Sequence, residues 1–141
     1  MPRIRASPKE LFLSHSNHDR AFALKLAATL RQHGVPTWHS ESNIRGGQQW
    51  HDEIGAALER CDWFAVVLSP DSVKSEWVKR ELLFALSEDR LRRRILPLHY
   101  RTTVPKRLSW TLSQYQIIDF RKRYEPACRE LLRIWGIGLR V

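Results

Sequence analysis

Short apolar runs alternate with helical patterns along this chain. The apolar runs predict strands over residues 10–14, 35–38, 62–68, 94–100 and 116–120. Apolar positions at helical spacing predict helices over residues 21–33, 48–60, 72–86 and 126–135. Connections this short between alternating elements imply right-handed crossovers. The pattern therefore predicts an α/β fold in which a parallel sheet has helices on both faces.

Residues that typically begin or end helices and strands lie at the ends of these predicted elements. Asn17 or Asp19 is placed to cap the helix over 21–33, and Gly34 ends it. Pro36 predicts that the strand over 35–38 lies at an edge or starts there. Pro126 suits the first turn of the last helix and Gly136 its end.

The strand over 62–68 and the helix after it form the centre of the pattern. At about 100° per residue, one stripe of this helix faces the core and consists of Val78, Leu82, Ala85 and Leu86. Trp77, Glu81 and Phe84 fall together along the flank of that stripe. A carboxylate between two aromatic rings would thus lie just past the carboxyl end of a strand, where open α/β sheets bind ligands. A solvated or salt-bridged surface glutamate fits the same spacing.

The length and the cysteine content indicate one domain over residues 1–141, with a core at about 9–136. A chain of 141 residues is long enough to bury a core without disulfides. Cys61 and Cys128 suggest neither a disulfide framework nor a zinc site, which favours a reducing, cytoplasmic setting. No apolar run approaches the roughly 20 residues that span a bilayer, and no signal peptide is visible at the start, so no membrane partner is expected.

The chain is strongly basic. It has 24 Lys and Arg against 15 Asp and Glu, a formal charge of +9, which favours polyanionic partners or phosphate-bearing ligands. Its densest basic runs lie at residues 90–94 and 121–123. A solvated helix end is the alternative explanation for both runs. The cations at 90–94 also complement the dipole at the carboxyl end of the helix that carries Trp77, which needs no partner.

Several familiar chemistries lack their residues here. The chain has no GxGxxG, and Gly46-Gly47 is not followed by the Lys-Ser/Thr of a phosphate-binding loop. Ser69-Pro70 is not the G-x-S-x-G turn of a serine hydrolase. Four histidines lie in or near predicted loops without the Cys or Asp spacing of a metal site, and these are His15, His18, His39 and His51.

Six short motifs remain, and they occur in a fixed order. They are Leu11-Phe12-Leu13-Ser14-His15-Ser16 with Asp19; Gly34-Val35 with Trp38; Ile44 before Gly46-Gly47; Val67-Leu68-Ser69-Pro70; Ser75-Glu76-Trp77 with Glu81-Leu82; and Ile95-Leu96-Pro97-Leu98. In this order and at these spacings the chain resembles a TIR domain, the Toll/interleukin-1 receptor homology domain. The resemblance covers about residues 9–136.

The resemblance implies a flavodoxin-like, three-layer fold with five parallel strands. Residues 40–47 then correspond to the family's BB loop, and Glu81 to the acidic residue of its W-x-x-x-E helix. Some TIR domains are adaptors that assemble through homotypic contacts, whereas others cleave the nicotinamide–ribose bond of NAD+. Trp77 and Glu81 are both retained here, which favours an NAD+ glycohydrolase of prokaryotic type, acting in defence or as an effector.

The implied site has Glu81 as the catalytic residue and NAD+ as substrate, with no cofactor and no metal. The residues expected to bind the substrate are Ser14, His15, Ser16, Trp38, Ser40, Arg45 and Trp77. Trp77 would stack on nicotinamide, and Arg45 would meet the pyrophosphate. Many relatives have aspartate where this chain has Ser40, and a loop proline where it has Gly46, so the contacts of that loop differ here.

Two other functions remain as alternatives. One is a TIR adaptor without activity, acting through homotypic TIR–TIR contacts and serving a separate sensor protein. The other is a basic module that holds nucleic acid, for which we expect only weak, non-specific binding. The resemblance also predicts that the NAD+-cleaving form is active only when assembled.

Overall fold

A five-stranded parallel sheet forms the middle layer of the molecule. The computed structural model describes residues 3–39 and 48–140, with the helical backbone alone for 48–50. The strands lie in the order β2-β1-β3-β4-β5, all parallel. Their bounds are β1 (Leu11–Ser14), β2 (Thr37–His39), β3 (Trp63–Leu68), β4 (Ile95–His99) and β5 (Ile118–Asp119). The five predicted strands are confirmed, and β2 occupies the edge position that Pro36 indicated.

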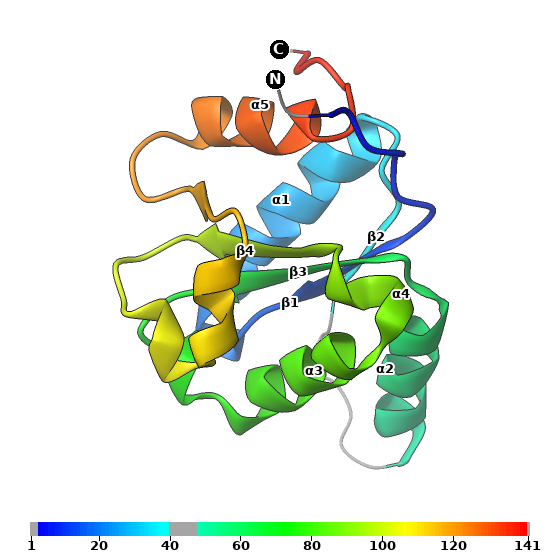
Figure 1. The fold of residues 1–141 in the computed structure, drawn as a ribbon, viewed down its shortest axis with the longest axis vertical. Coiled ribbons are helices and arrows are strands. Elements are labelled where there is room, and N and C mark those ends of the chain that lie inside the picture. Colours follow the sequence, from blue (N-terminus) through cyan, green and yellow to red (C-terminus); the bar gives the residue numbers. More distant parts are fainter. Residues whose placement is uncertain (1–2, 40–47, 141) are drawn as a thin grey trace.

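Helices cover both faces of this sheet, which confirms the flavodoxin-like three-layer fold (Figure 1). On one face lie α1 (Arg20–Gln32) and α5 (Tyr124–Arg133). On the other lie α2 (Gln48–Arg60), α3 (Glu76–Ser87) and the short α4 (Asp89–Arg92). The two ends of the described chain meet beside α5, where the Arg5 amide donates to the Ile134 carbonyl at 2.9 Å.

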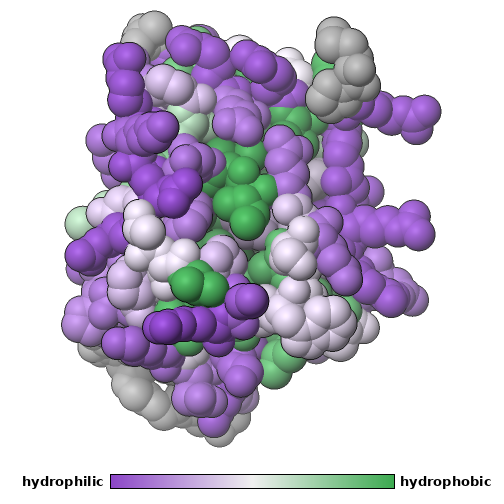
Figure 2. All heavy atoms as spheres, turned by 60° about the vertical axis from the view of Figure 1, so that its left-hand side comes forward, coloured by the Kyte–Doolittle hydropathy of each residue, from purple (hydrophilic) through white to green (hydrophobic). Residues whose placement is uncertain are grey.

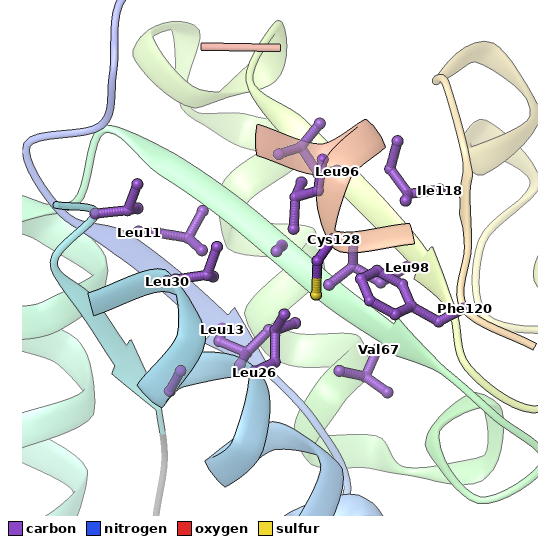
Figure 3. Packing of buried hydrophobic residues seen from close by; sticks show 14 of the residues in the cluster. Leu11, Leu13, Leu26, Leu30, Val67, Leu96, Leu98, Ile118, Phe120 and Cys128 are labelled. Atoms are coloured by element: carbon purple, nitrogen blue, oxygen red, sulfur yellow. The ribbon is translucent and has the colours of Figure 1, made fainter. Parts of the chain in front are cut away.

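Each face of the sheet carries its own hydrophobic core. Alternate residues of a strand point to opposite faces, so Leu11 and Leu13 join the core under α1 and α5, whereas Phe12 joins the core under α2 and α3. Figure 3 shows Leu26 and Leu30 of α1 and Cys128 of α5 reaching toward the strand residues of the first core.

The helix predicted over 72–86 is divided in two. Residues Ser72–Lys74 form one 3-10 turn, and α3 begins only at Glu76. Ser75 separates the two because its backbone is extended, with ψ 115°, and its Oγ accepts a hydrogen bond from the Val78 amide at 3.2 Å. Ser75 is therefore the N-cap of α3.

Two further predictions about helix ends had different outcomes. Gly34 and Gly136 both have positive φ, 81° and 71°, as expected of residues that end helices. Asp19, one of the two residues expected to cap α1, is its N-cap residue, but its side chain makes no capping hydrogen bond. Its carboxylate instead accepts hydrogen bonds from the hydroxyls of Ser16 and Ser69.

The surface is largely hydrophilic. Figure 2 shows one face on which hydrophilic residues surround a limited hydrophobic area. Among residues 3–39 and 48–140, no helix combines the length and the apolar content needed to cross a membrane.

Candidate active site

Glu81 is a buried carboxyl group on α3. It lies in the middle of α3 and is only 3% exposed, so it is buried in the core rather than on its margin as the helical wheel suggested. Ser14, the last residue of β1, points to the same face of the sheet as Phe12 and donates a hydrogen bond from its Oγ to Oε1 of Glu81 at 2.6 Å. The structure thus brings together two of the predicted site residues, 67 positions apart in sequence.

Burial changes the acid–base behaviour of this carboxyl group. Burial raises the pKa of Glu81 to about 8, because removal from water disfavours the charged form. Hydrogen bonds from Ser14 and from the Trp77 side chain oppose this rise by stabilising the carboxylate, but they only partly offset it. Glu81 is therefore largely protonated at pH 7, and it is poised to ionise near neutrality.

A cavity of about 240 Å³ opens beside Glu81 between α2 and α3. From α3 it is lined by Trp77, Arg80, Glu81 and Phe84, so the two aromatic residues predicted to flank the carboxylate do so. The opposite wall comes from α2 and consists of His51, Ile54, Gly55, Leu58 and Glu59. The cavity therefore combines apolar and aromatic walls with a few charged or titratable groups, Glu81 among them, which is the usual composition of a small-molecule site.

The wall formed by α2 was not among the predicted site residues. Positions 51, 54, 55 and 58 follow the i, i+3, i+4, i+7 spacing of one helical face, so the sequence does contain a signal for it. His51 lies near Trp77, with the ring centroids 6.3 Å apart and the planes nearly perpendicular. The packing of α2 against α3 decides which face of each helix lines the cavity. The sequence pattern alone does not predict this packing.

His15 and Ser16 follow Ser14 in the loop after β1, and both are buried. The His15 Nδ1 lies 2.8 Å from the Ser16 carbonyl oxygen, and the His15 ring lies 5.8 Å from the ring of His39 at the end of β2. Both predicted residues therefore lie at the carboxyl edge of the sheet beside Ser14. They do not line the cavity that contains Glu81.

A buried polar network joins the loops that follow β1 and β3. Asp19 is 1% exposed, and its Oδ2 accepts hydrogen bonds from the hydroxyls of Ser16 and Ser69. The Ser69 Oγ accepts from the Ser72 amide at 3.0 Å, and the Ser72 Oγ accepts from the Ser69 amide at 2.9 Å. This network ties the loop after β1 to the segment leading into α3 at the switch point between β1 and β3, where sheets of this type bind ligands.

Trp38 packs on the hydrophobic core next to the site. Its ring lies 5.0 Å from that of Phe12, and it packs on the same hydrophobic core as Trp77 and Phe84. Trp38 does not line the Glu81 cavity, so its predicted contact with substrate stays a prediction. Ser40 and Arg45, the two remaining predicted binding residues, lie outside the described residues.

Among the described residues, no group of three His, Cys, Asp or Glu side chains is arranged to hold a metal ion. Cys61 and Cys128 are both buried free thiols. Burial raises the pKa of Cys61 to about 11, so this thiol is protonated and unreactive at neutral pH.

Comparison with known proteins identifies the family. The family model described as TIR domain matches residues 11–132, nearly the whole of the sheet and its helices. The chain belongs to the TIR family. Among solved structures, the TIR domain of the Toll-related receptor TRR-2 from Hydra magnipapillata superposes with a TM-score of 0.69, at 24% identity over 87% of this chain and 94% of that one.

Two similar relatives of this TIR domain are bacterial proteins with an enzymatic name. One is the 2' cyclic ADP-D-ribose synthase AbTIR of Acinetobacter baumannii, 36% identical over 74 residues, which cover 52% of this chain and 28% of that protein. The other is the 2' cyclic ADP-D-ribose synthase BtTIR of Bacteroides thetaiotaomicron, 30% identical over 74 residues, which cover 52% of this chain and 26% of that protein. The match therefore spans about a quarter of the length of these relatives.

Proposed function

We propose that this TIR domain cleaves the bond between nicotinamide and ribose in NAD+, with Glu81 as the catalytic residue. The observation that carries the proposal is the buried Ser14–Glu81 pair at the wall of an aromatic-lined cavity. Two bacterial relatives named as 2' cyclic ADP-D-ribose synthases support it from outside the structure. The protein would then be an NAD+ nucleosidase, releasing nicotinamide by hydrolysis or by cyclisation.

The chemistry required suits a single carboxylate. Nicotinamide leaves an already cationic nucleotide as a neutral molecule, so no general acid is needed. The demand is to stabilise the positive charge that develops on the ribose, as carboxylates do in glycosidases. Glu81 must be ionised for this role. A cationic nicotinamide ring near Glu81 favours the ionised form and lowers the pKa of this carboxyl group.

The aromatic walls serve the same step. Trp77 and Phe84 line the same cavity as Glu81, and a flat base can stack on rings of this kind. Their low polarity strengthens the attraction between Glu81 and a developing cation, because water is excluded from between them. The nucleophile that reaches the ribose decides the product. Water gives ADP-ribose, and a hydroxyl group of the substrate itself gives a cyclic form.

The test is nicotinamide release from NAD+ by concentrated purified protein, followed by chromatography of the products. Glu81→Gln keeps the size and the hydrogen bonding of the side chain and removes its charge, so we expect activity to fall on the order of 10²-fold or more. Glu76→Gln, on an exposed residue of the first turn of α3, is the matched control and should leave activity unchanged.

Two outcomes would contradict the proposal in different ways. A fully active Glu81→Gln variant would refute the site assignment while leaving the reaction in place. A wild-type protein that releases no nicotinamide at any concentration would instead favour a TIR adaptor that acts by homotypic contact.

Self-association is the second part of the proposal. We infer from the family that specific activity rises faster than linearly with protein concentration, because the active form is an assembly of TIR domains. A dilution series with light scattering tests this inference, and Ile44→Ala or Arg45→Ala tests the loop of residues 40–47. Flat specific activity from a protein that stays monomeric throughout would rule it out. We also propose that the protein acts in the cytoplasm, in defence signalling with a separate sensor protein.

A further inference from the structure

A second cavity lies on the opposite face of the sheet from Glu81, between α1 and α5. Its volume is about 480 Å³, twice that of the cavity beside Glu81. It is lined by α1 and the residue after it, by the start of α5, and by the C-terminal segment: Lys25, Thr29, Gln32, His33, Arg123, Tyr124, Glu125, Leu139 and Arg140. None of these residues takes part in the candidate active site.

Hydrogen bonds fix the wall where α1 meets α5. The Thr29 hydroxyl donates to the Lys25 carbonyl at 3.1 Å, so the Tyr124 hydroxyl must be the donor in its 2.7 Å bond to Thr29. The ammonium group of Lys25 lies 4.0 Å from the centre of the Tyr124 ring. Burial raises the pKa of Tyr124, so the phenol stays neutral and does not repel an anion.

The C-terminal segment closes the cavity through His33. The Arg140 amide donates to the His33 Nε2 at 3.0 Å, which makes Nε2 an acceptor and leaves Nδ1 to donate to the Thr29 carbonyl at 2.7 Å. The Arg140 guanidinium also donates to the Gln32 carbonyl at 2.6 Å. These bonds hold Arg140 at the rim and still leave most of its N–H groups available.

The charges around this cavity are mainly positive. Lys25, Arg123 and Arg140 face a single carboxylate, that of Glu125. Arg123 belongs to the basic run at 121–123, and within that run Arg121 is already paired with Asp119 at 2.9 and 3.0 Å. In the part of the chain that the structure describes, no carboxylate lies within 4.0 Å of the Lys25, Arg123 or Arg140 charge.

We propose that this cavity, named here the α1–α5 site, binds the diphosphate group of a small anionic molecule. Three cations from three separate segments converge on a space large enough for such a group, and two of them are arginines, whose planar groups bind phosphate oxygens in pairs. The Tyr124 ring already carries Lys25 on its face and packs edge-on with Phe22, at 6.4 Å between centroids, so charge rather than base stacking would provide the affinity. The proposal does not depend on NAD+ cleavage.

The experiment is a titration of the ¹⁵N-labelled chain with inorganic pyrophosphate, with calorimetry for the affinity. We expect the largest amide shifts at His33, Tyr124 and Arg140. The Lys25→Ala/Arg123→Ala variant removes two exposed cations of the site and should bind about tenfold more weakly. The Lys106→Ala/Arg107→Ala variant is the control. It lowers the formal charge equally, from +9 to +7, at an exposed turn away from the site, and should bind as the wild type does.

Further titrations test whether the diphosphate is bound alone or as part of a nucleotide, and several results would overturn the proposal. ADP that shifts the same amides with the affinity of pyrophosphate supports a site for diphosphate alone. Shifts confined to the Glu81 side of the sheet would overturn the proposal, and so would equal weakening in the two double variants. Binding of duplex DNA without measurable binding of pyrophosphate would also overturn it, since general surface charge would then explain the contacts. Thermal melting of each variant checks that the fold is intact.

Discussion

The Ser14 hydroxyl donates to Oε1 of Glu81 at 2.6 Å, and this bond links the carboxyl end of β1 to the middle of α3. The donor belongs to the central part of the sheet, whereas the Trp77 side chain, which also hydrogen-bonds the carboxylate, belongs to α3 itself. The orientation of Glu81 is therefore set by the packing of α3 against β1, and the charged form of Glu81 depends on a neutral donor.

The first prediction concerns Ser14→Ala. Loss of the hydroxyl removes a hydrogen bond that favours the carboxylate, so the pKa of Glu81 should rise further above its ordinary value. If Glu81 must be ionised, kcat/KM of the wild type should increase with pH, with a midpoint at about pH 8. In Ser14→Ala the midpoint should move to higher pH, and activity at pH 7 should fall about three- to tenfold.

Nicotinamide release measured from pH 6 to pH 9.5 checks this prediction. Ser113→Ala is the matched control, because the Ser113 hydroxyl is exposed and bonds only to the nearby Trp110 carbonyl. An unchanged pH profile in Ser14→Ala would show that the Ser14 bond does not tune Glu81.

The second prediction concerns stability against pH. Glu81 has a pKa of about 8 in the fold and an ordinary value of 4.5 in the unfolded chain, so between these pH values the folded state holds a proton that the unfolded chain has lost. The stability that the neutral buried carboxyl provides is complete below about pH 4.5 and is lost progressively up to about pH 8. Glu81→Gln cannot ionise and should gain on the wild type over this range, by up to about 4 kcal/mol.

Urea unfolding at pH 5, 7 and 8.5 measures this difference for Glu81→Gln and for the exposed Glu76→Gln. We expect the advantage of Glu81→Gln over the wild type to grow with pH, and that of Glu76→Gln to stay flat. A constant difference for both variants would mean that Glu81 titrates at an ordinary pKa in the fold.

The third prediction concerns the Asp19 network. Asp19 and Ser69 come from different loops, and the bond between them is fully buried. Asp19→Ala leaves the hydroxyls of Ser16 and Ser69 without their acceptor, which typically costs about 1–3 kcal/mol. In a double-mutant cycle, Asp19→Ala and Ser69→Ala should be coupled by at least about 0.5 kcal/mol in the free energy of unfolding. Additive effects would show that the two loops are held independently.

The fourth prediction concerns the basic run at residues 90–94. Arg90 donates to the carbonyls of Leu58 and Cys61 at the end of α2, so it satisfies acceptors that the helix leaves open. Arg90→Ala should lower the free energy of unfolding by about 1–2 kcal/mol. Arg93→Ala, in the same run and exposed, should change it by less than about 0.5 kcal/mol. Equal effects in thermal or urea melts would mean that the run acts only through general charge.

The strands and the helix over 48–60 could be predicted because their signals are local. A short, continuous apolar run such as Trp63–Leu68, bounded by turn residues, is typical of a strand that is buried on both faces. The helix over 48–60 was predicted with the bounds that the structure shows. The TIR motifs added the flavodoxin-like, five-stranded form of the sheet to the general α/β pattern, and the order of the strands came from the structure.

The burial of Glu81 could not be predicted from the helical wheel. The wheel placed Leu86 in the core stripe and Glu81 on its flank, whereas Glu81 is buried and Leu86 is only partly buried. A buried carboxyl group needs a partner, and that partner, Ser14, comes from a strand far away in sequence. The wheel treats one helix by itself, so it cannot register such a contact.

The role of Arg90 was hidden for the same reason. A cation at a helix end is usually solvated, and the local sequence offers nothing to contradict that reading. The carbonyls that Arg90 meets belong to another helix, whose end is brought near only by the packing of α2 beside the segment after α3. A local spacing pattern cannot predict a contact that a long side chain makes with a different helix or strand.

Pro97 of β4 lies at an outer margin of the sheet, where the described residues place no further strand beside it, just before the pairing with the edge strand β5 begins. Backbone groups of successive β4 residues point alternately to its two neighbours, and the Arg94 carbonyl bonds β3 while the His99 carbonyl bonds the residue after β5. Pro97 therefore faces the β5 side, where the pairing starts only at Leu98. A proline has no N–H to offer an incoming chain, so this margin resists the addition of a foreign strand and the aggregation that would follow.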